Sequence, residues 1–102
     1  MHEIVWSDEA LRDFERLHVR HQRAIAVGVE ALRYRPTAPP TLHRKPLEEP
    51  LDELGASAWE LRLGEFRLFF SVDEETRTVT VLRVILKGRW TTLEALRRSR
   101  RS

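Results

Sequence analysis

The segment that most constrains the fold is residues 59–73, where apolar and polar residues alternate on both sides of Gly64-Glu65. Alternation with a period of two is typical of strands that bury one face, and a glycine in a two-residue connection supplies the positive φ of a type II′ turn. Such a turn fixes the register, so Arg62 is expected opposite Arg67. The apolar residues then share the core face: Trp59, Leu61, Leu63, Phe66, Leu68 and Phe70.

Arg62 and Arg67 fall together on the other face of this hairpin. Two like charges directly opposite one another repel, so the arrangement costs stability unless a negative charge relieves it. A bound phosphate could supply that charge, and so could an acid of the chain itself, Glu60 or Glu65. The first alternative indicates a binding surface, and the second an ordinary sheet face.

The composition limits the classes of function. A chain of 102 residues is expected to form one domain with a single core. There is no cysteine, which excludes disulfides and thiolate chemistry. No apolar run is long enough to span a bilayer, and the N-terminus does not have the pattern of a signal peptide. We expect a cytoplasmic protein with no membrane partner, metal or cofactor.

The charge is distributed unevenly. Residues 1–76 carry 10 basic and 15 acidic residues, a net charge of −5, whereas residues 77–102 carry 8 basic residues and Glu94 alone, a net charge of +7. This separation is typical of a basic working surface or a basic tail, here about residues 97–102. Only two of the 18 basic residues are lysine, and an arginine bias suits bidentate phosphate recognition.

Helical structure is expected in the first third of the chain. Residues 2–6 are typical of a short strand, and Ser7 is a good N-cap for a following helix. Apolar residues then recur at helical spacing as far as Arg33: Leu11, Phe14, Leu17, Ile25, Val29 and Leu32. Either one long helix or a helical hairpin fits this pattern. Residues 34–57 form a proline-rich connection whose leucines are expected to contact the core: Leu42, Leu47, Leu51 and Leu54.

Three strands are expected at about residues 58–63, 66–73 and 78–87, joined as an antiparallel meander. A three-residue second turn would place Asp73 opposite Arg77 and Arg67 opposite Arg83. Leu82, Val84 and Leu86 would then complete the core face, whereas a shift of one residue would turn Arg83 toward the core instead. The predicted fold class is α+β, with about four strands covered on one face by the helices of residues 7–33.

The first of the two registers aligns Arg62, Arg67 and Arg83 in a row across the three strands. With the basic residues that follow, Lys87 and Arg89, this row would suit a phosphate backbone. Phe69 is expected to be exposed on the same face, where an aromatic ring beside arginines can stack on a base. His18 and His21 have a spacing compatible with a metal, but no carboxylate at a matching step accompanies them.

Four motifs combine into a recognisable pattern. The first is a helix pattern that begins at Ser7-Asp8-Glu9-Ala10-Leu11, and the second is Lys45-Pro46-Leu47, which follows the proline-ended helix. The third is the hairpin of residues 59–70, and the fourth is a strand with a basic end at residues 79–89. Over residues 2–90 the chain resembles the small toxins of the RelE/ParE superfamily, from bacterial type II toxin–antitoxin modules. The resemblance implies two helices packed on an antiparallel sheet and a cognate antitoxin as partner.

The resemblance implies the toxin of a type II module, and the function we expect is that of a ribosome-associated mRNA interferase, with a non-enzymatic toxin as the alternative. RelE-like members cleave mRNA on the ribosome, through attack of a 2′-hydroxyl on the neighbouring phosphate. Carried over by position, that activity implies Arg67, Arg89 and Arg62 as catalytic residues. Four further residues of the same face are expected to contact the substrate: Lys87, Phe69, Arg83 and Glu60. ParE-like members instead poison DNA gyrase without that catalytic set, and a toxin-fold relic that only binds its antitoxin is a third alternative.

The sequence departs from the RelE-like pattern at two points. Glu60 stands where ribosome-dependent members often have a basic residue. Residues 90–95 offer neither the tyrosine nor the histidine that many members use, and the only tyrosine of the chain is Tyr34. The general acid and base of an RNA-cleaving enzyme are therefore not identified from the sequence.

Overall fold

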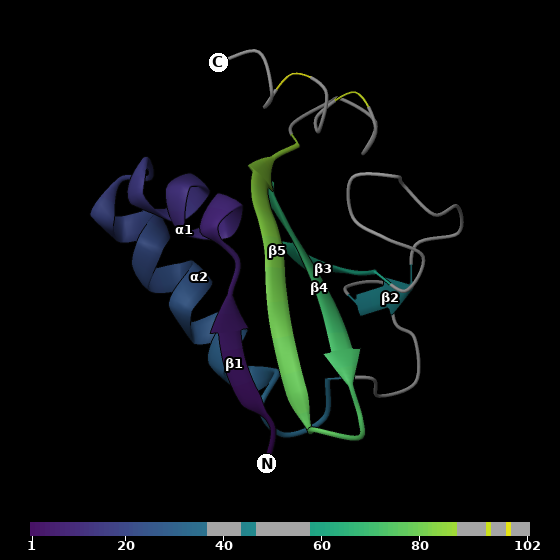
Figure 1. The fold of residues 1–102 in the computed structure, drawn as a ribbon. Coiled ribbons are helices and arrows are strands. Elements are labelled where there is room, and N and C mark those ends of the chain that lie inside the picture. Colours follow the sequence, from purple (N-terminus) through teal and green to yellow (C-terminus); the bar gives the residue numbers. More distant parts are fainter. Residues whose placement is uncertain (37–43, 47–57, 88–93, 95–97, 99–102) are drawn as a thin grey trace.

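A computed structural model of the chain describes residues 1–36, 44–46 and 58–87, together with Glu94 and Arg98. The elements are β1 (Glu3–Trp6), α1 (Asp8–Glu15), α2 (Val19–Ala31), β2 (Arg44–Pro46), β3 (Trp59–Leu63), β4 (Phe66–Asp73) and β5 (Thr78–Leu86). The five strands form one sheet in the order β1-β5-β4-β3-β2. Figure 1 shows both helices together on one side of this sheet, which is the predicted α+β architecture.

Residues 7–33 contain two helices, α1 and α2, which settles the alternative that the sequence left open. Ser7 caps α1, and its hydroxyl accepts a hydrogen bond from the Ala10 amide at 3.1 Å. α2 has its own cap, because Nδ1 of His18 accepts from the Arg20 amide at 3.2 Å. A histidine N-cap therefore marks the break, without the glycine or proline that usually signals one.

The core lies between the helices and one face of the sheet. Ile25, Val29 and Leu32 of α2 are buried with the core-facing residues of the hairpin, as the pattern predicted. Leu11 is an exception, since it is 42% exposed and Ala10 is the buried residue of α1 instead. Gly28 lets α2 approach β3 closely, because a Cβ at this position would lie 2.8 Å from the Leu63 methyl groups.

The β3–β4 hairpin has the predicted register. Leu63 pairs with Phe66, Arg62 with Arg67, and Leu61 with Leu68. Gly64 has a φ of 60°, in the left-handed region that a glycine adopts readily. The tight turn therefore decides which side chains of the two strands share a face.

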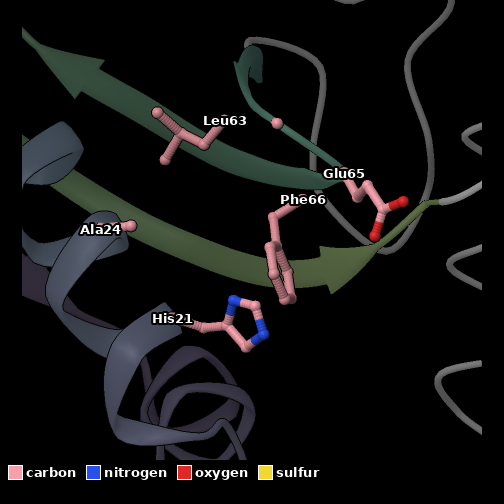
Figure 2. A pocket seen from close by; sticks show the side chains of 6 residues that line it. His21, Ala24, Leu63, Glu65 and Phe66 are labelled. Carbon is pink, nitrogen blue, oxygen red and sulfur yellow. The ribbon is translucent and has the colours of Figure 1, made fainter.

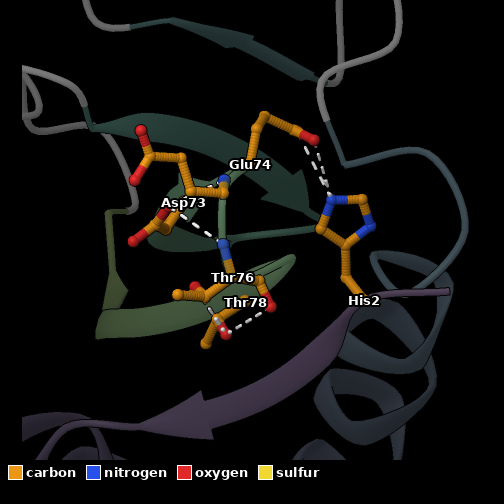
Figure 3. A network of polar contacts seen from close by, with 6 residues as sticks. His2, Asp73, Glu74, Thr76 and Thr78 are labelled. Carbon is orange, nitrogen blue, oxygen red and sulfur yellow. Dashed lines mark hydrogen bonds and ion pairs between the residues drawn. The ribbon is translucent and has the colours of Figure 1, made fainter.

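The predicted register of β5 was wrong. Asp73 pairs with Thr78, so four residues form the turn, and Arg77 has a φ of 53°. Oδ1 of Asp73 accepts from the amides of Glu75 and Thr76 at 2.9 and 3.3 Å, which holds the turn in this form (Figure 3).

A bulge in β5 changes the register a second time. Phe70 pairs with Val81, but Phe69 pairs with Arg83, so Leu82 is an extra residue. The buried positions on the helix-covered face are consequently Val79, Val81 and Val84. Leu82 is half-buried and Leu86 is 57% exposed, so neither completes the core as predicted.

The predicted connection contains a strand that the sequence did not indicate. β2, of three residues, pairs antiparallel with β3 through Arg44–Leu61, Lys45–Glu60 and Pro46–Trp59. The four leucines expected to pin this connection to the core lie outside the described residues. No helix in the described part of the chain is long and apolar enough to cross a membrane.

Candidate functional site

The predicted site begins with Arg62 and Arg67, which face one another across the hairpin. Both lie on the far face of the sheet, which we define as the face turned away from the helices. Their environments differ, because Arg62 is exposed and Arg67 is only 7% exposed. The face that was expected to be exposed is therefore buried at Arg67.

The Arg67 guanidinium is held by its own hairpin. Nη1 donates to the carbonyl oxygens of Gly64 and Phe66 at 2.8 and 2.9 Å. Nε lies 3.5 Å from Oε1 of Glu60, and both side chains are less than a tenth exposed. An acid of the chain thus relieves the repulsion between the arginines, as one of the two alternatives predicted.

Burial lowers the pKa of Arg67 from its usual value, and the nearby charge of Arg62 lowers it further, whereas Glu60 acts in the opposite direction. A guanidinium stays protonated in proteins despite such shifts. Arg67 is therefore a buried cation, whose neighbour Glu60 carries the compensating charge.

Arg83 does not extend a row of arginines across the sheet. Its Nε and Nη2 donate to the two carboxylate oxygens of Asp13 in α1, at 2.7 and 3.2 Å. The Asp13 carboxylate also accepts from the Val84 amide at 3.0 Å. The bulge re-aims Arg83 into this contact, and the residue is only 6% exposed. The predicted role of Arg83 in substrate binding is not supported by this position.

Phe69 also has a different environment from the one predicted. It pairs with Glu60 and Arg83 on neighbouring strands and has no exposed surface. Ile85, another residue of the far face, is 4% exposed. This part of the sheet is buried on both faces. The alternation of residues along β4 therefore does not separate buried from exposed side chains. Phe69 is consequently not positioned to stack on a base.

The end of β5 adjoins the hairpin turn. The Lys87 amide donates to the Glu65 carbonyl at 3.0 Å, which places this predicted residue near Arg62 and Arg67 along the sheet. Arg89 lies outside the described residues. Of the predicted site residues, the structure therefore gathers Arg62, Arg67, Glu60 and Lys87 around one hairpin.

A pocket that the sequence did not predict lies on the other side of this hairpin. It has a volume of about 430 Å³ and is formed by two residues of α2 and four of the turn region: His21, Ala24, Leu63, Gly64, Glu65 and Phe66. Figure 2 shows the rings of His21 and Phe66 close together, and their centroids are 5.0 Å apart. The sequence does contain a signal for the position of His21 in this pocket. Its helical spacing places His21 on the same side of α2 as Ile25 and Leu32.

His18 and His21 lie near one another, at the N-cap and in the first turn of α2. His18 uses Nδ1 to cap α2, and its ring centroid lies 6.4 Å from that of His21. No group of three or more potential metal ligands occurs among the described residues.

The comparison with protein families accounts for this fold. Residues 4–89 match the family model described as the ParE toxin of the type II toxin–antitoxin system parDE. The chain belongs to the ParE toxin family. Among curated proteins, none matches this ParE-family sequence significantly.

The solved structures that are similar to this ParE-family chain include isolated toxins and toxin–antitoxin complexes. The RelBE2 toxin–antitoxin complex of Mycobacterium tuberculosis matches with 28% identity and a TM-score of 0.65, over 81% of this chain and 94% of that chain. The RelE–RelB complex of Pyrococcus horikoshii matches with 20% identity and a TM-score of 0.68, over 86% and 97%. The isolated RelE toxin of E. coli matches with 15% identity and a TM-score of 0.64, over the full length of both chains. The resemblance seen in the sequence is thereby confirmed.

Proposed function

We propose that this type II toxin acts by binding a cellular target, as gyrase-poisoning ParE-like members do, and not by cutting mRNA. Cleavage by a 2′-hydroxyl requires cations at the phosphate, together with a base and an acid. The observation that carries the proposal is that Arg67 and Arg83 are both in internal ion pairs, with Glu60 and Asp13. Glu60, the carboxylate candidate for a base beside Arg67 in the described structure, is buried against that arginine.

The second candidate function is that of a ribosome-associated mRNA interferase. Two observations favour it: Arg62 is exposed beside Arg67, and the RelBE2 complex matches the chain with 28% identity. If the toxin is an mRNA interferase, the scissile phosphate would be contacted by Arg62, Arg67 and Arg89. Lys87 would orient the RNA backbone.

A cognate antitoxin is the proposed protein partner under either candidate. Several of the similar solved structures are toxin–antitoxin complexes. Among the predicted site residues that the structure describes, Arg62 is an exposed cation to which an antitoxin could bring carboxylates. Binding through such a contact weakens as the salt concentration rises.

The two candidate functions are separated by two assays on the same induced protein. Primer extension on mRNA from a translating extract reports cleavage, and a purified gyrase reaction reports trapped DNA breaks. We expect trapped breaks and a DNA-damage response without mRNA cuts. Codon-phased cuts that depend on translation, with gyrase unaffected, would overturn the proposal and support the interferase. An Arg62→Ala variant in both assays would show whether the exposed cation takes part.

A further inference from the structure

The pocket between α2 and the β3–β4 turn has no role in the proposed function. We call it the turn pocket; its volume is about 430 Å³, and it is formed by His21, Ala24, Leu63, Gly64, Glu65 and Phe66. Small-molecule sites usually have volumes of about 300–1,000 Å³ and combine an apolar lining with a few polar groups. Here the lining is mainly apolar, and the polar groups are the His21 ring and the Glu65 carboxylate. The turn pocket therefore has the size and the composition of a ligand site.

Two aromatic rings of the turn pocket are placed to hold a flat ligand. The ring centroids of His21 and Phe66 are 5.0 Å apart and the ring planes are inclined by 56°, so the two rings do not stack on one another. Phe66 also packs against the core, which fixes its position. Figure 2 shows the two rings next to each other, with Ala24 and Leu63 beside them. Proteins hold unpaired nucleobases against aromatic rings of this kind.

The surface of α2 beside the turn pocket is basic. Residues 16–29 include three arginines and two histidines but no acidic residue. Arg20 precedes Ala24 by one helical turn and therefore lies on the same side of α2, and Arg23 is next to Ala24 in the sequence. Both arginines are exposed, and neither side chain has a hydrogen bond or an ion pair among the described residues. Guanidinium groups in such positions suit phosphate groups.

Glu65 gives the turn pocket a hydrogen-bond acceptor. Its side chain is exposed and makes no hydrogen bond or ion pair within the part of the chain that the structure describes. Carboxylates accept hydrogen bonds from the amino group of cytosine, a group that thymine lacks. The pocket is therefore expected to prefer cytosine to thymine.

We propose that the turn pocket binds an unpaired nucleobase of a single nucleic-acid strand, while Arg20 and Arg23 contact the neighbouring phosphates. An acidic peptide fits less well, because its carboxylates would meet Glu65 at the same pocket. The site lies on the helix side of the sheet, whereas Arg62 lies on the far face. This inference goes beyond the proposed function and holds for either candidate function.

The inference is tested with Ala24→Leu and a matched control, Ala31→Leu. Both alanines are exposed on α2, but only Ala24 lines the turn pocket. Fluorescence anisotropy of the free toxin uses four labelled probes: short single strands of deoxycytidylate, thymidylate and cytidylate, and a DNA duplex. Because leucine at position 24 displaces the base, we expect the affinity for deoxycytidylate to fall at least about tenfold, with a change below about twofold for Ala31→Leu. Thermal unfolding checks that both variants fold.

Arg20→Gln tests the phosphate contact without a change in the pocket itself. We expect the affinity for deoxycytidylate to fall about threefold and to depend less steeply on salt, because one cation fewer meets the strand. Arg77→Gln, in the distal turn, is the control and should bind like the unmodified chain. In NMR spectra of the unmodified toxin, the ring signals of His21 and Phe66 should shift when deoxycytidylate is added.

The outcomes of these measurements are distinct. Tighter binding of deoxycytidylate than of thymidylate, lost in Ala24→Leu, supports the inference, and the comparison with cytidylate shows whether DNA or RNA supplies the base. Equal affinities of Ala24→Leu and Ala31→Leu would overturn it. Duplex binding as tight as single-strand binding would also overturn it, because charge alone would then be recognised. The same conclusion would follow if the folded, unmodified toxin bound none of the strands.

Discussion

Nε of Arg67 and Oε1 of Glu60 lie 3.5 Å apart on neighbouring strands, in surroundings where both side chains are less than a tenth exposed. This separation is longer than the 2.7 Å between Arg83 and Asp13, the other buried pair of the described structure. Charge-assisted hydrogen bonds usually have lengths of about 2.7–2.9 Å. The Glu60–Arg67 pair is therefore the looser of the two, and the backbone carbonyls of the hairpin supply the rest of the Arg67 contacts.

Replacing Glu60 is expected to destabilise the fold. In Glu60→Gln the Arg67 cation stays buried without its compensating charge, which costs about 3 kcal/mol in the free energy of unfolding. Urea denaturation measures this change. The matched substitution Glu65→Gln removes an exposed carboxylate and is expected to change stability by less than about 0.5 kcal/mol. Equal stability of the two variants would show that Glu60 does not compensate Arg67.

Asp13→Asn is expected to be at least as costly as Glu60→Gln. The carboxylate accepts from Arg83 and from the Val84 amide, so the substitution removes a partly buried negative charge from three donors. We expect a loss of about 3–5 kcal/mol, measured by urea denaturation. Glu15→Gln, at an exposed position of the same helix, serves as the control. A loss below about 1 kcal/mol would contradict the role of this contact in joining α1 to β5.

Gly64 provides a test of backbone conformation without a packing change. Its φ is 60° and a Cβ added at this position would have no atom within 4 Å, so any cost of substitution comes from the backbone. Gly64→Ala should lower the free energy of unfolding by about 1–2 kcal/mol. Gly64→Asn should cost less, because asparagine tolerates the left-handed region better. Thermal unfolding of both variants gives the comparison, and equal losses would contradict this origin.

Arg62 is the predicted site residue whose removal should affect binding and not folding. Because its side chain is exposed, Arg62→Ala is expected to leave the unfolding temperature unchanged and to weaken antitoxin binding about two- to fivefold. Calorimetry at two salt concentrations should show a smaller salt dependence for the variant. Arg77→Ala, in the distal turn, is the control. If both variants bind like the unmodified chain, Arg62 lies outside the interface.

The sequence predicted the hairpin correctly because a two-residue turn leaves one register for its strands. Arg62 opposite Arg67 follows from that local geometry alone. The pairing of β5 depended instead on the length of the second turn and on the bulge at Leu82, and neither has a distinctive sequence signal. A positive φ at Arg77 is uncommon for a residue other than glycine, so the fourth turn residue was not expected.

The chemistry of the candidate site was harder to predict than its position. Alternation indicates which side chains share a face, but it does not indicate whether that face is buried. Phe69 and Arg67 were placed on the correct face with the wrong exposure for this reason. The Asp13–Arg83 pair joins residues 70 positions apart, and a single sequence contains no signal for such a contact.

The parallel pairing of β1 with β5 has a consequence for how the chain is made. Glu3 pairs with Thr78, so the first strand to leave the ribosome waits for the last strand of the sheet before it can be paired. Contacts so distant in sequence form slowly, because a long loop must close first. During synthesis the backbone of Ile4, Val5 and Trp6 therefore remains without its partner strand until β5 has emerged. The sheet of this toxin is therefore complete only after residues 78–86 have emerged, and a truncated product that lacks β5 leaves β1 without a neighbouring strand.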